Sequence, residues 1–283
     1  MKVRKFLLEN DKGQLFDMNN LKESCILISP SELGASYKSD FLLLGNTFIE
    51  DNRTIEQKNP SGTIYFKNYD KCKEFIDFIE SAKELKFVYI IPFENEEKKY
   101  YRDVSIREFQ KTEKHSRMLA CPIVFNGLSL WYEKKEIIYT ISRNEQELRW
   151  TYKWASRFKS YNIRSIAFNN AGHVEAPLYL ELQGYLKNPS IAVYVNGKEI
   201  YNLSIPITLN EYEKLLYSTA DNNMYLYKEE TDGSMTNLFT NEYIDISKNN
   251  IFKLPKGVSE VRLTADNEIL KGKLTILEQF KAV

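Results

Sequence analysis

One short segment of this chain has a helical hydrophobic period, and that segment constrains the fold more than any other feature. The apolar side chains Cys72, Phe75, Ile76 and Ile79 recur at steps of three and four, with charged side chains between them. This spacing forms one apolar stripe on a helix of about three turns. Asn68 precedes the stripe and is a favoured N-cap residue. We predict one amphipathic helix that docks on a sheet.

The rest of the chain follows the period of two that strands require. Residues 63–67 and 85–92 read as strands on either side of the helix, and residues 104–125 read as a long hairpin. In the second half, Asn196-Gly197 is a strong signal for a tight hairpin turn. Short alternating strands at this spacing are typical of antiparallel sandwiches. The fold class is therefore predicted to be mainly β.

Two further stretches read as strands. Residues 37–49 supply further strand, interrupted at Gly45-Asn46. Residues 118–125 are apolar on both faces of any strand that they form. Such a strand is either covered by helix and sheet within the subunit or pressed against another subunit.

The length of 283 residues favours two domains over one all-β domain. The composition shifts to charged and polar residues at 133–147, so we predict domains at 1–140 and 141–283. Trp150, Tyr152 and Trp154 then alternate on one face. Such a row stacks on sugars, seals a sandwich or lines a domain interface.

The overall charge limits the kinds of partner. Lys plus Arg and Asp plus Glu number 39 each, so a whole-chain electrostatic grip on DNA or an anionic membrane is not expected. Residues 1–10 lack the apolar core of a signal peptide, and apolar runs such as 41–44 are too short to span a bilayer. We expect a soluble product made in a cytoplasm, with no membrane partner.

The nucleophile and base residues form no recognisable motif. Cys25, Cys72 and Cys121 lie far apart in sequence without metal-ligand or disulfide spacing, and His115 and His173 are isolated. We predict no catalytic, cofactor-binding or metal-binding residues.

Two further sets of polar residues are read as ordinary surface or turn residues. The first lacks the dense alternation of a calcium loop: Asp221, Asn223, Glu229 and Asp232. The second is basic and interleaved with aromatics, but it stands in a chain without net positive charge: Lys153, Arg157, Lys159 and Arg164.

The order of motifs resembles the distal tail proteins of long-tailed phages that infect Gram-positive bacteria. In the first half the resemblance rests on residues 6–10, 66–69, 75–79, 111–113, 121–125 and 130–132. In the second half it rests on Asn170-Ala171-Gly172, Ala176-Pro177, Gly184, residues 188–191 and residues 254–258. Each motif is loose alone, and their order over nearly the whole chain carries the resemblance.

This resemblance implies two antiparallel β-sandwich domains. The N-terminal one has a single helix and a long hairpin and forms rings, and the C-terminal one is galectin-like. It further implies a homohexameric ring at the virion tail tip, through which DNA only passes. The partners implied are the tail tube protein, the tail-tip protein and receptor-binding parts.

Combining the resemblance with the apolar run, we expect residues 118–125 to supply the contact between subunits. The alternative function is a carbohydrate-binding module for host cell-wall attachment, motivated by the galectin-like half and the Trp150 row. A cell-wall glycosidase is a distant third, because it needs only two carboxylates.

Overall fold

The computed structural model describes residues 3–94, 96–112, 114–115, 118–140, 164–240, 242–245, 248–266 and 271–283. The chain divides into two compact units. The N-terminal unit comprises residues 1–133 and 279–283, and the C-terminal unit comprises residues 134–278. This division falls before the boundary predicted at 140/141, which stays a prediction.

The N-terminal unit contains the one helix found among the described residues. Its elements are β1 (Lys5–Asn10), β2 (Leu15–Asp17), β3 (Cys25–Ser31), β4 (Tyr37–Leu44), β5 (Thr47–Ile55), β6 (Ser61–Phe66), α1 (Tyr69–Glu80), β7 (Leu85–Pro92), β8 (Glu97–Phe109), β9 (Lys114–His115) and β10 (Met118–Gly127). β11 (Trp131–Thr140) crosses the division between the units.

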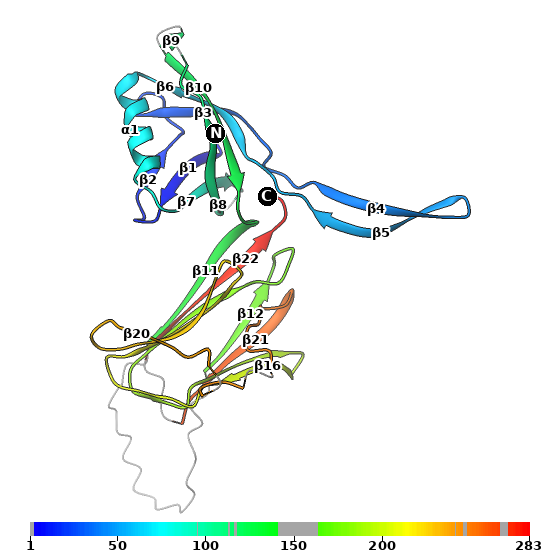
Figure 1. Cartoon of the computed structure of the whole chain (residues 1–283), viewed down its shortest axis with the longest axis vertical. Helices are drawn as coiled ribbons and strands as arrows, with labels where there is room; N and C mark the ends of the chain where they lie inside the picture. Colours follow the sequence, from blue (N-terminus) through cyan, green and yellow to red (C-terminus); the bar gives the residue numbers. More distant parts are fainter. Residues whose placement is uncertain are drawn as a thin grey trace, which may run out of the picture. The chain divides into compact units, whose positions relative to one another are not determined.

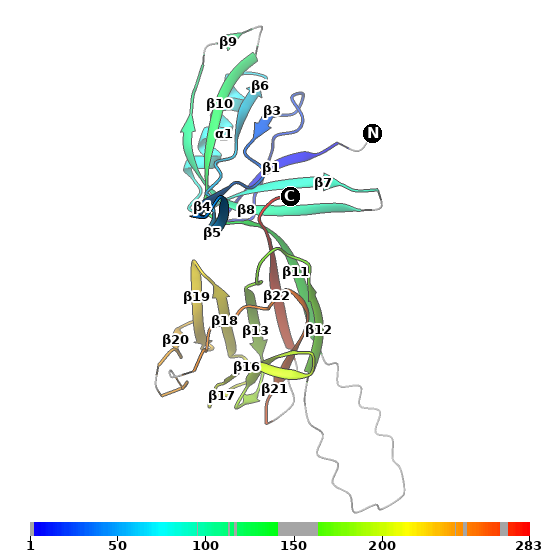
Figure 2. The same ribbon diagram turned by 90° about the vertical axis from the view of Figure 1, so that its right-hand side faces the viewer.

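The long strand β8 joins two antiparallel groups of strands in this unit. Its first part pairs with β7, which continues through β1 to β2, and its second part pairs with β10, which continues through β6 to β3. Figure 2 shows β7 and β8 side by side as a long hairpin. The groups meet again where Leu27 donates to the carbonyl of Met18 at 2.9 Å. The strands therefore nearly enclose one core.

The helix α1 is the one predicted from the helical spacing of apolar residues. The Asn68 side chain accepts a hydrogen bond from the Lys71 backbone nitrogen at 2.9 Å, as an N-cap does. Phe75 is fully buried, and its ring lies 5.2–5.5 Å from those of Phe16, Phe66 and Phe109. One face of α1 thus completes the core, while its charged residues face solvent.

The structure corrects the expectation for residues 118–125. β10 is a central strand, paired with β6 on one side and with β8 and β9 on the other. Leu119, Cys121, Ile123 and Phe125 are buried in the core of their own unit, and the alternate residues are half-buried. The strand reads as apolar throughout because its outer face is also partly covered. The strand therefore does not present a free surface to a second subunit.

The C-terminal unit is built from short strands. They are β12 (Arg164–Asn170), β13 (Leu178–Gln183), β14 (Leu186–Lys187), β15 (Ser190–Val195), β16 (Lys198–Ser204), β17 (Thr208–Leu209), β18 (Lys214–Ala220), β19 (Asn223–Glu229), β20 (Met235–Asn237), β21 (Gly257–Thr264) and β22 (Lys271–Phe280, of which the last two residues belong to the N-terminal unit).

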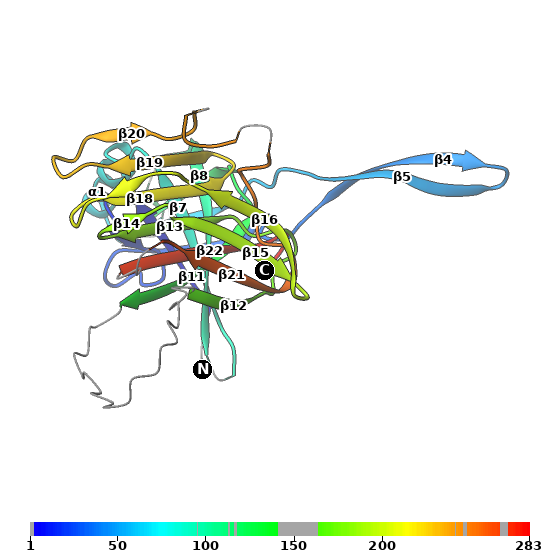
Figure 3. The same cartoon turned by 90° about the horizontal axis from the view of Figure 1, so that it is seen from below.

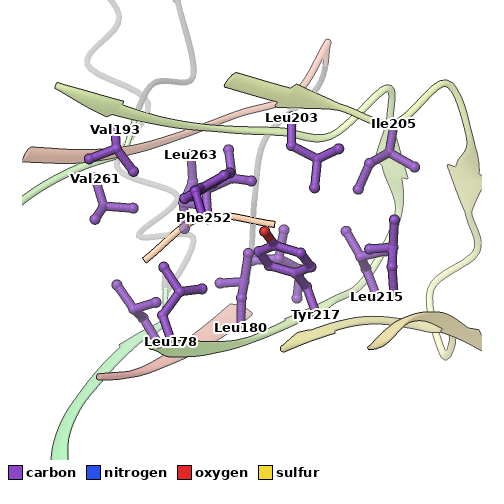
Figure 4. Packing of buried hydrophobic residues seen from close by; sticks show 14 of the residues in the cluster. Leu178, Leu180, Val193, Leu203, Ile205, Leu215, Tyr217, Phe252, Val261 and Leu263 are labelled. Carbon is purple, nitrogen blue, oxygen red and sulfur yellow. The ribbon is translucent and has the colours of Figure 1, made fainter. Parts of the chain in front are cut away.

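Two antiparallel sheets enclose the core of this unit. One has the order β22-β13-β18-β19-β20 and the other β12-β21-β15-β16. Figure 4 shows Leu178 and Leu180 of the first sheet facing Val193 and Leu263 of the second, with Phe252 between them. The mainly β prediction is confirmed, and the galectin-like detail stays a prediction.

The hairpin predicted at Asn196-Gly197 is also confirmed. These residues join β15 to β16 and have φ angles of 51° and 78°. Two successive positive φ values are what a type I′ turn requires.

Candidate assembly surface

β4 and β5 form a two-stranded arm on the N-terminal unit. Among the described strands they pair only with each other, and Figures 1 and 3 show them extending away from the rest of that unit. Leu44 pairs with Thr47 across a two-residue turn, where Gly45 has a φ of 63°. Type II′ hairpin turns place glycine at this position. Because an isolated two-stranded hairpin is only marginally stable in water, we expect another surface to cover the arm.

The distal half of the arm is apolar on both faces. Opposite residues of an antiparallel pair share a face, so Leu43 and Phe48 project to one side and Leu42 and Ile49 to the other. Six large side chains, between 47% and 70% exposed, form what we call the arm tip: Phe41, Leu42, Leu43, Leu44, Phe48 and Ile49. A contiguous exposed apolar patch of this kind marks an interaction site.

The hairpin predicted at residues 104–125 is present as the pair β8 and β10, and the arm is a second hairpin that was not predicted. The sequence predicted strand at 37–49 but treated Gly45-Asn46 as an interruption rather than as a turn. A Gly-Asn pair between two apolar runs is itself a hairpin signal, so the sequence contained enough information to predict this hairpin. The exposure of the hairpin could not be predicted in the same way, because apolar strands are usually covered.

The root of the arm is held by paired contacts. The backbone nitrogen of Glu56 donates to the carbonyl of Ser36 at 3.0 Å, and the Ser36 hydroxyl donates to the Glu56 carboxylate at 2.8 Å. The guanidinium of Arg53 lies 4.0 Å from the centre of the Tyr37 ring. These contacts fix where the arm leaves the unit.

Behind the root lies a buried arginine. Arg102 is 5% exposed, donates from Nε to the carbonyl of Ser129 at 2.9 Å, and lies over the Trp131 ring at 5.7 Å. Burial lowers the pKa of Arg102. Gln57, which follows the arm, donates to the carbonyl of Gly127 at 2.8 Å. The arm is thereby tied to the turn that follows β10.

The three cysteines lie in the core of the N-terminal unit rather than at a reactive site. All three are fully buried. Burial raises the pKa of Cys25 to about 12, and burial together with the neighbouring Cys121 raises the pKa of Cys72 to about 11. Thiols with such pKa values are poor nucleophiles at neutral pH.

The acidic residues weighed as calcium ligands have other partners. Asp221 pairs with Lys253 at 2.6 Å, and Glu229 pairs with Lys214 at 3.6 Å. Asp232 accepts a hydrogen bond at 2.9 Å from the backbone nitrogen two residues later. Within the described ranges, no group of three or more His, Cys, Asp or Glu could hold a metal ion.

Other sequence candidates are only partly covered by the structure. The Trp150, Tyr152 and Trp154 row and the basic residues Lys153, Arg157 and Lys159 lie outside the described residues. Arg164 begins β12, and His115 ends β9. His173 lies in the bend after β12. The prediction that the chain has no catalytic, cofactor or metal residues stays a prediction.

Several motifs of the second half meet in one place. Asn170 donates from Nδ2 to the carbonyl of Leu254 at 3.2 Å, and Ala176 exchanges two backbone hydrogen bonds of 2.8 Å with Leu254. The Glu278 carboxylate, 3% exposed, accepts a bond from the Ala171 nitrogen at 2.9 Å. These motifs therefore build a connection within the C-terminal unit.

A buried carboxylate fastens another turn of the C-terminal unit. Glu213 is 4% exposed, accepts a hydrogen bond from the Asn210 backbone nitrogen at 2.7 Å, and pairs with Lys228 at 3.1 Å. Burial opposes ionisation here, but the bonds from Asn210 and Lys228 outweigh it and lower the pKa of Glu213 to about 2.

The described helix cannot cross a membrane, because it is neither long nor apolar enough. Among the features above, the arm tip is the one that leaves a large apolar area uncovered. The geometry therefore favours assembly over catalysis as the property to be explained.

Comparison with known proteins also points to a role in assembly. Residues 5–128 match the family model described as "Distal tail protein, N-terminal domain". No curated protein matches the chain.

Solved structures resemble the chain over its whole length. A chain of the phage P2 baseplate in its activated conformation with calcium has a TM-score of 0.68 at 16% identity and covers 100% of both chains. The same baseplate with strontium gives 0.67 at 16% identity, again over 100% of both chains. The Dit protein of phage SPP1, described as a hub of the adsorption apparatus, gives 0.54 at 10% identity over 99% of this chain and 100% of its own.

These similarities show the fold, and the match over residues 5–128 shows the kind of N-terminal domain. Residues 5–128 therefore form an N-terminal domain of the distal tail protein family.

Proposed function

We propose that copies of this chain close into a hexameric ring, a non-enzymatic hub that joins the end of the tail tube to the tail-tip protein. Receptor-binding parts attach to this hub, and DNA passes through its channel without being held. Each copy contributes its N-terminal unit to the ring, and its C-terminal unit faces the other tail components.

The arm tip is the observation that carries this proposal. A surface with six apolar side chains on two faces has to be covered by protein, because leaving it in water is unfavourable. A strand of nine residues at roughly 3.3 Å each makes the arm about 30 Å long, enough to reach over a neighbouring domain. The zero net charge adds little repulsion between copies.

The mass of the purified full-length protein tests the ring. We expect native mass spectrometry to give a closed oligomer, either for the protein alone or after mixing with tail tube and tail-tip proteins. A stable monomer that joins neither partner would contradict the proposal.

A matched pair of variants tests the role of the arm. Phe48→Asp places a charge on a side chain 70% exposed in the arm tip, and Ile138→Asp does the same at a strand residue 69% exposed in the C-terminal unit. We expect Phe48→Asp to abolish the oligomer while circular dichroism still shows a folded protein, since both substitutions are at the surface. Ile138→Asp should leave both properties unchanged. Equal assembly of the two variants would remove the arm from the proposal.

A further inference from the structure

A short segment, Gln279–Val283, belongs to the N-terminal unit although it follows the C-terminal unit in sequence. The Phe280 ring packs edge-on against the ring of buried Tyr100, with 5.4 Å between the ring centres. Val283 also packs against the core of this unit. We call Gln279–Val283 the strap, because the core holds it at two residues.

The strap contacts the arm at the first residue of β4. The ammonium of Lys281 lies 5.6 Å from the centre of the Tyr37 ring. The guanidinium of Arg53, on β5, lies 4.0 Å from the centre of the same ring. A cation within about 6 Å of the ring centre is attracted by the face of a tyrosine ring. Tyr37 therefore interacts with one cation of the arm and with one cation of the strap.

The remaining contacts at the root join the two sides of the arm to each other. Ser36 and Glu56 share a backbone and a side-chain hydrogen bond, and Arg53 reaches across from β5 to Tyr37. These contacts hold the hairpin together at its root. They do not connect it to the core of the unit, so they leave its direction unspecified.

The chain is anchored to the core on both sides of the arm. Before the arm, Trp131 donates from Nε1 to the carbonyl of Leu33 at 3.0 Å. After the arm, Gln57 donates to the carbonyl of Gly127 at 2.8 Å. Both anchors lie outside β4 and β5, and a few connecting residues next to anchored structure can act as a hinge. A contact on the arm itself, such as that of Lys281, restrains motion about this hinge.

We propose that the strap sets the direction of the arm: the core holds Phe280 and Val283, and Lys281 holds Tyr37. When this contact is lost, the arm swings about its two anchors. A segment that is distant in sequence thus controls the direction in which the arm tip is presented. The proposal concerns a single copy, so it holds whether or not copies of the chain assemble.

A distance measurement between two spin labels tests the strap. In the full-length protein, one label is attached at Thr47→Cys in the exposed turn of the arm and one at Lys73→Cys on the exposed side of α1. The three native cysteines are buried and do not take up label. Excess unlabelled protein restricts the measurement to distances within one copy. Double electron–electron resonance should give a single narrow distribution for this pair.

Substitutions at residue 281 separate the charge of the side chain from its packing. Lys281→Met keeps most of the apolar stem and removes the cation, so it should about double the width of the distance distribution. Lys281→Arg keeps a cation over the ring and should leave the distribution narrow. The matched control is Lys271→Met, at an exposed position near the start of the same strand, β22, and it should have no effect.

The outcomes decide between the strap and a passive segment. A distribution for Lys281→Met as narrow as that of the parent pair would overturn the proposal. Equal broadening by Lys271→Met, or broadening by Lys281→Arg as large as that by Lys281→Met, would also overturn it. None of these results depends on the ring, because the distances are measured within one copy.

Discussion

Gly127 lies so close to Arg102 that a Cβ at residue 127 would stand 2.4 Å from Nη2 of the guanidinium and 2.3 Å from the carbonyl oxygen of Lys58. The carbonyl is backbone and the arginine is buried, so neither can move away easily. We expect Gly127→Ala to lower the free energy of unfolding of the N-terminal unit by about 1–3 kcal/mol, as overpacking does. Chemical denaturation measures this, with Gly34→Ala as control, because a Cβ there meets nothing within 4 Å. Equal stability of the two variants would contradict the expected clash.

The helix cap gives a second prediction. Asn68→Ala removes the acceptor of the Lys71 backbone hydrogen bond, so the free energy of unfolding should fall by about 1 kcal/mol. Asn52→Ala, at an exposed position of the arm, should change it by less than about 0.5 kcal/mol. Urea denaturation of the two variants side by side decides the matter, and a loss equal to that of Asn52→Ala would argue against the cap.

Because β10 is a central strand, two of its neighbouring residues should respond differently to an introduced charge. Ile123 is 1% exposed, so Ile123→Asp buries a carboxylate without a partner and should prevent folding. Val124 is half-buried on the outer face, and Val124→Asp should lose about 1 kcal/mol and stay folded. Soluble yield and circular dichroism distinguish the two outcomes. A folded Ile123→Asp protein would mean that this face is not core.

The pH dependence of the C-terminal unit follows from Glu213. Its pKa is lowered from 4.5 to about 2 in the folded state, so the ionised form stabilises the fold above pH 4.5. That contribution is lost as the pH falls from 4.5 towards 2. Glu213→Gln should therefore lower the free energy of unfolding by about 2 kcal/mol at pH 7, and the difference from wild type should close near pH 2.

Denaturation of the C-terminal unit at pH 7 and at pH 2.5 tests this prediction. Glu211→Gln is the matched control, because Glu211 lies in the same turn and is exposed. A difference for Glu213→Gln that is the same at both pH values would assign the effect to packing rather than to ionisation.

Local patterns were enough to locate some elements. The spacing of Cys72, Phe75 and Ile79 located the helix, because no strand can bury residues at steps of three and four on one face. Asn196-Gly197 located a hairpin, because few residue pairs accept two positive φ angles. In both cases the physical cause acts within a few residues.

Other features depend on parts of the chain that are distant in sequence. Whether residues 118–125 face a second subunit is decided by β6 and β8, which cover both edges of that strand. Leu42 and Phe48 are exposed because none of the described elements covers them, and a local sequence pattern carries no information about this. The candidate site was therefore the least predictable part of the molecule.

The bulge between Asp40 and Phe41 changes the direction of the arm just before its tip. If the tip binds the next copy, that contact is heterologous, and heterologous contacts either close into a ring or continue as a helical filament. The rotation from one copy to the next then depends on the local twist at this bulge. Asp51 is the additional residue at this bulge, so its deletion would change that rotation and with it the closure of the ring.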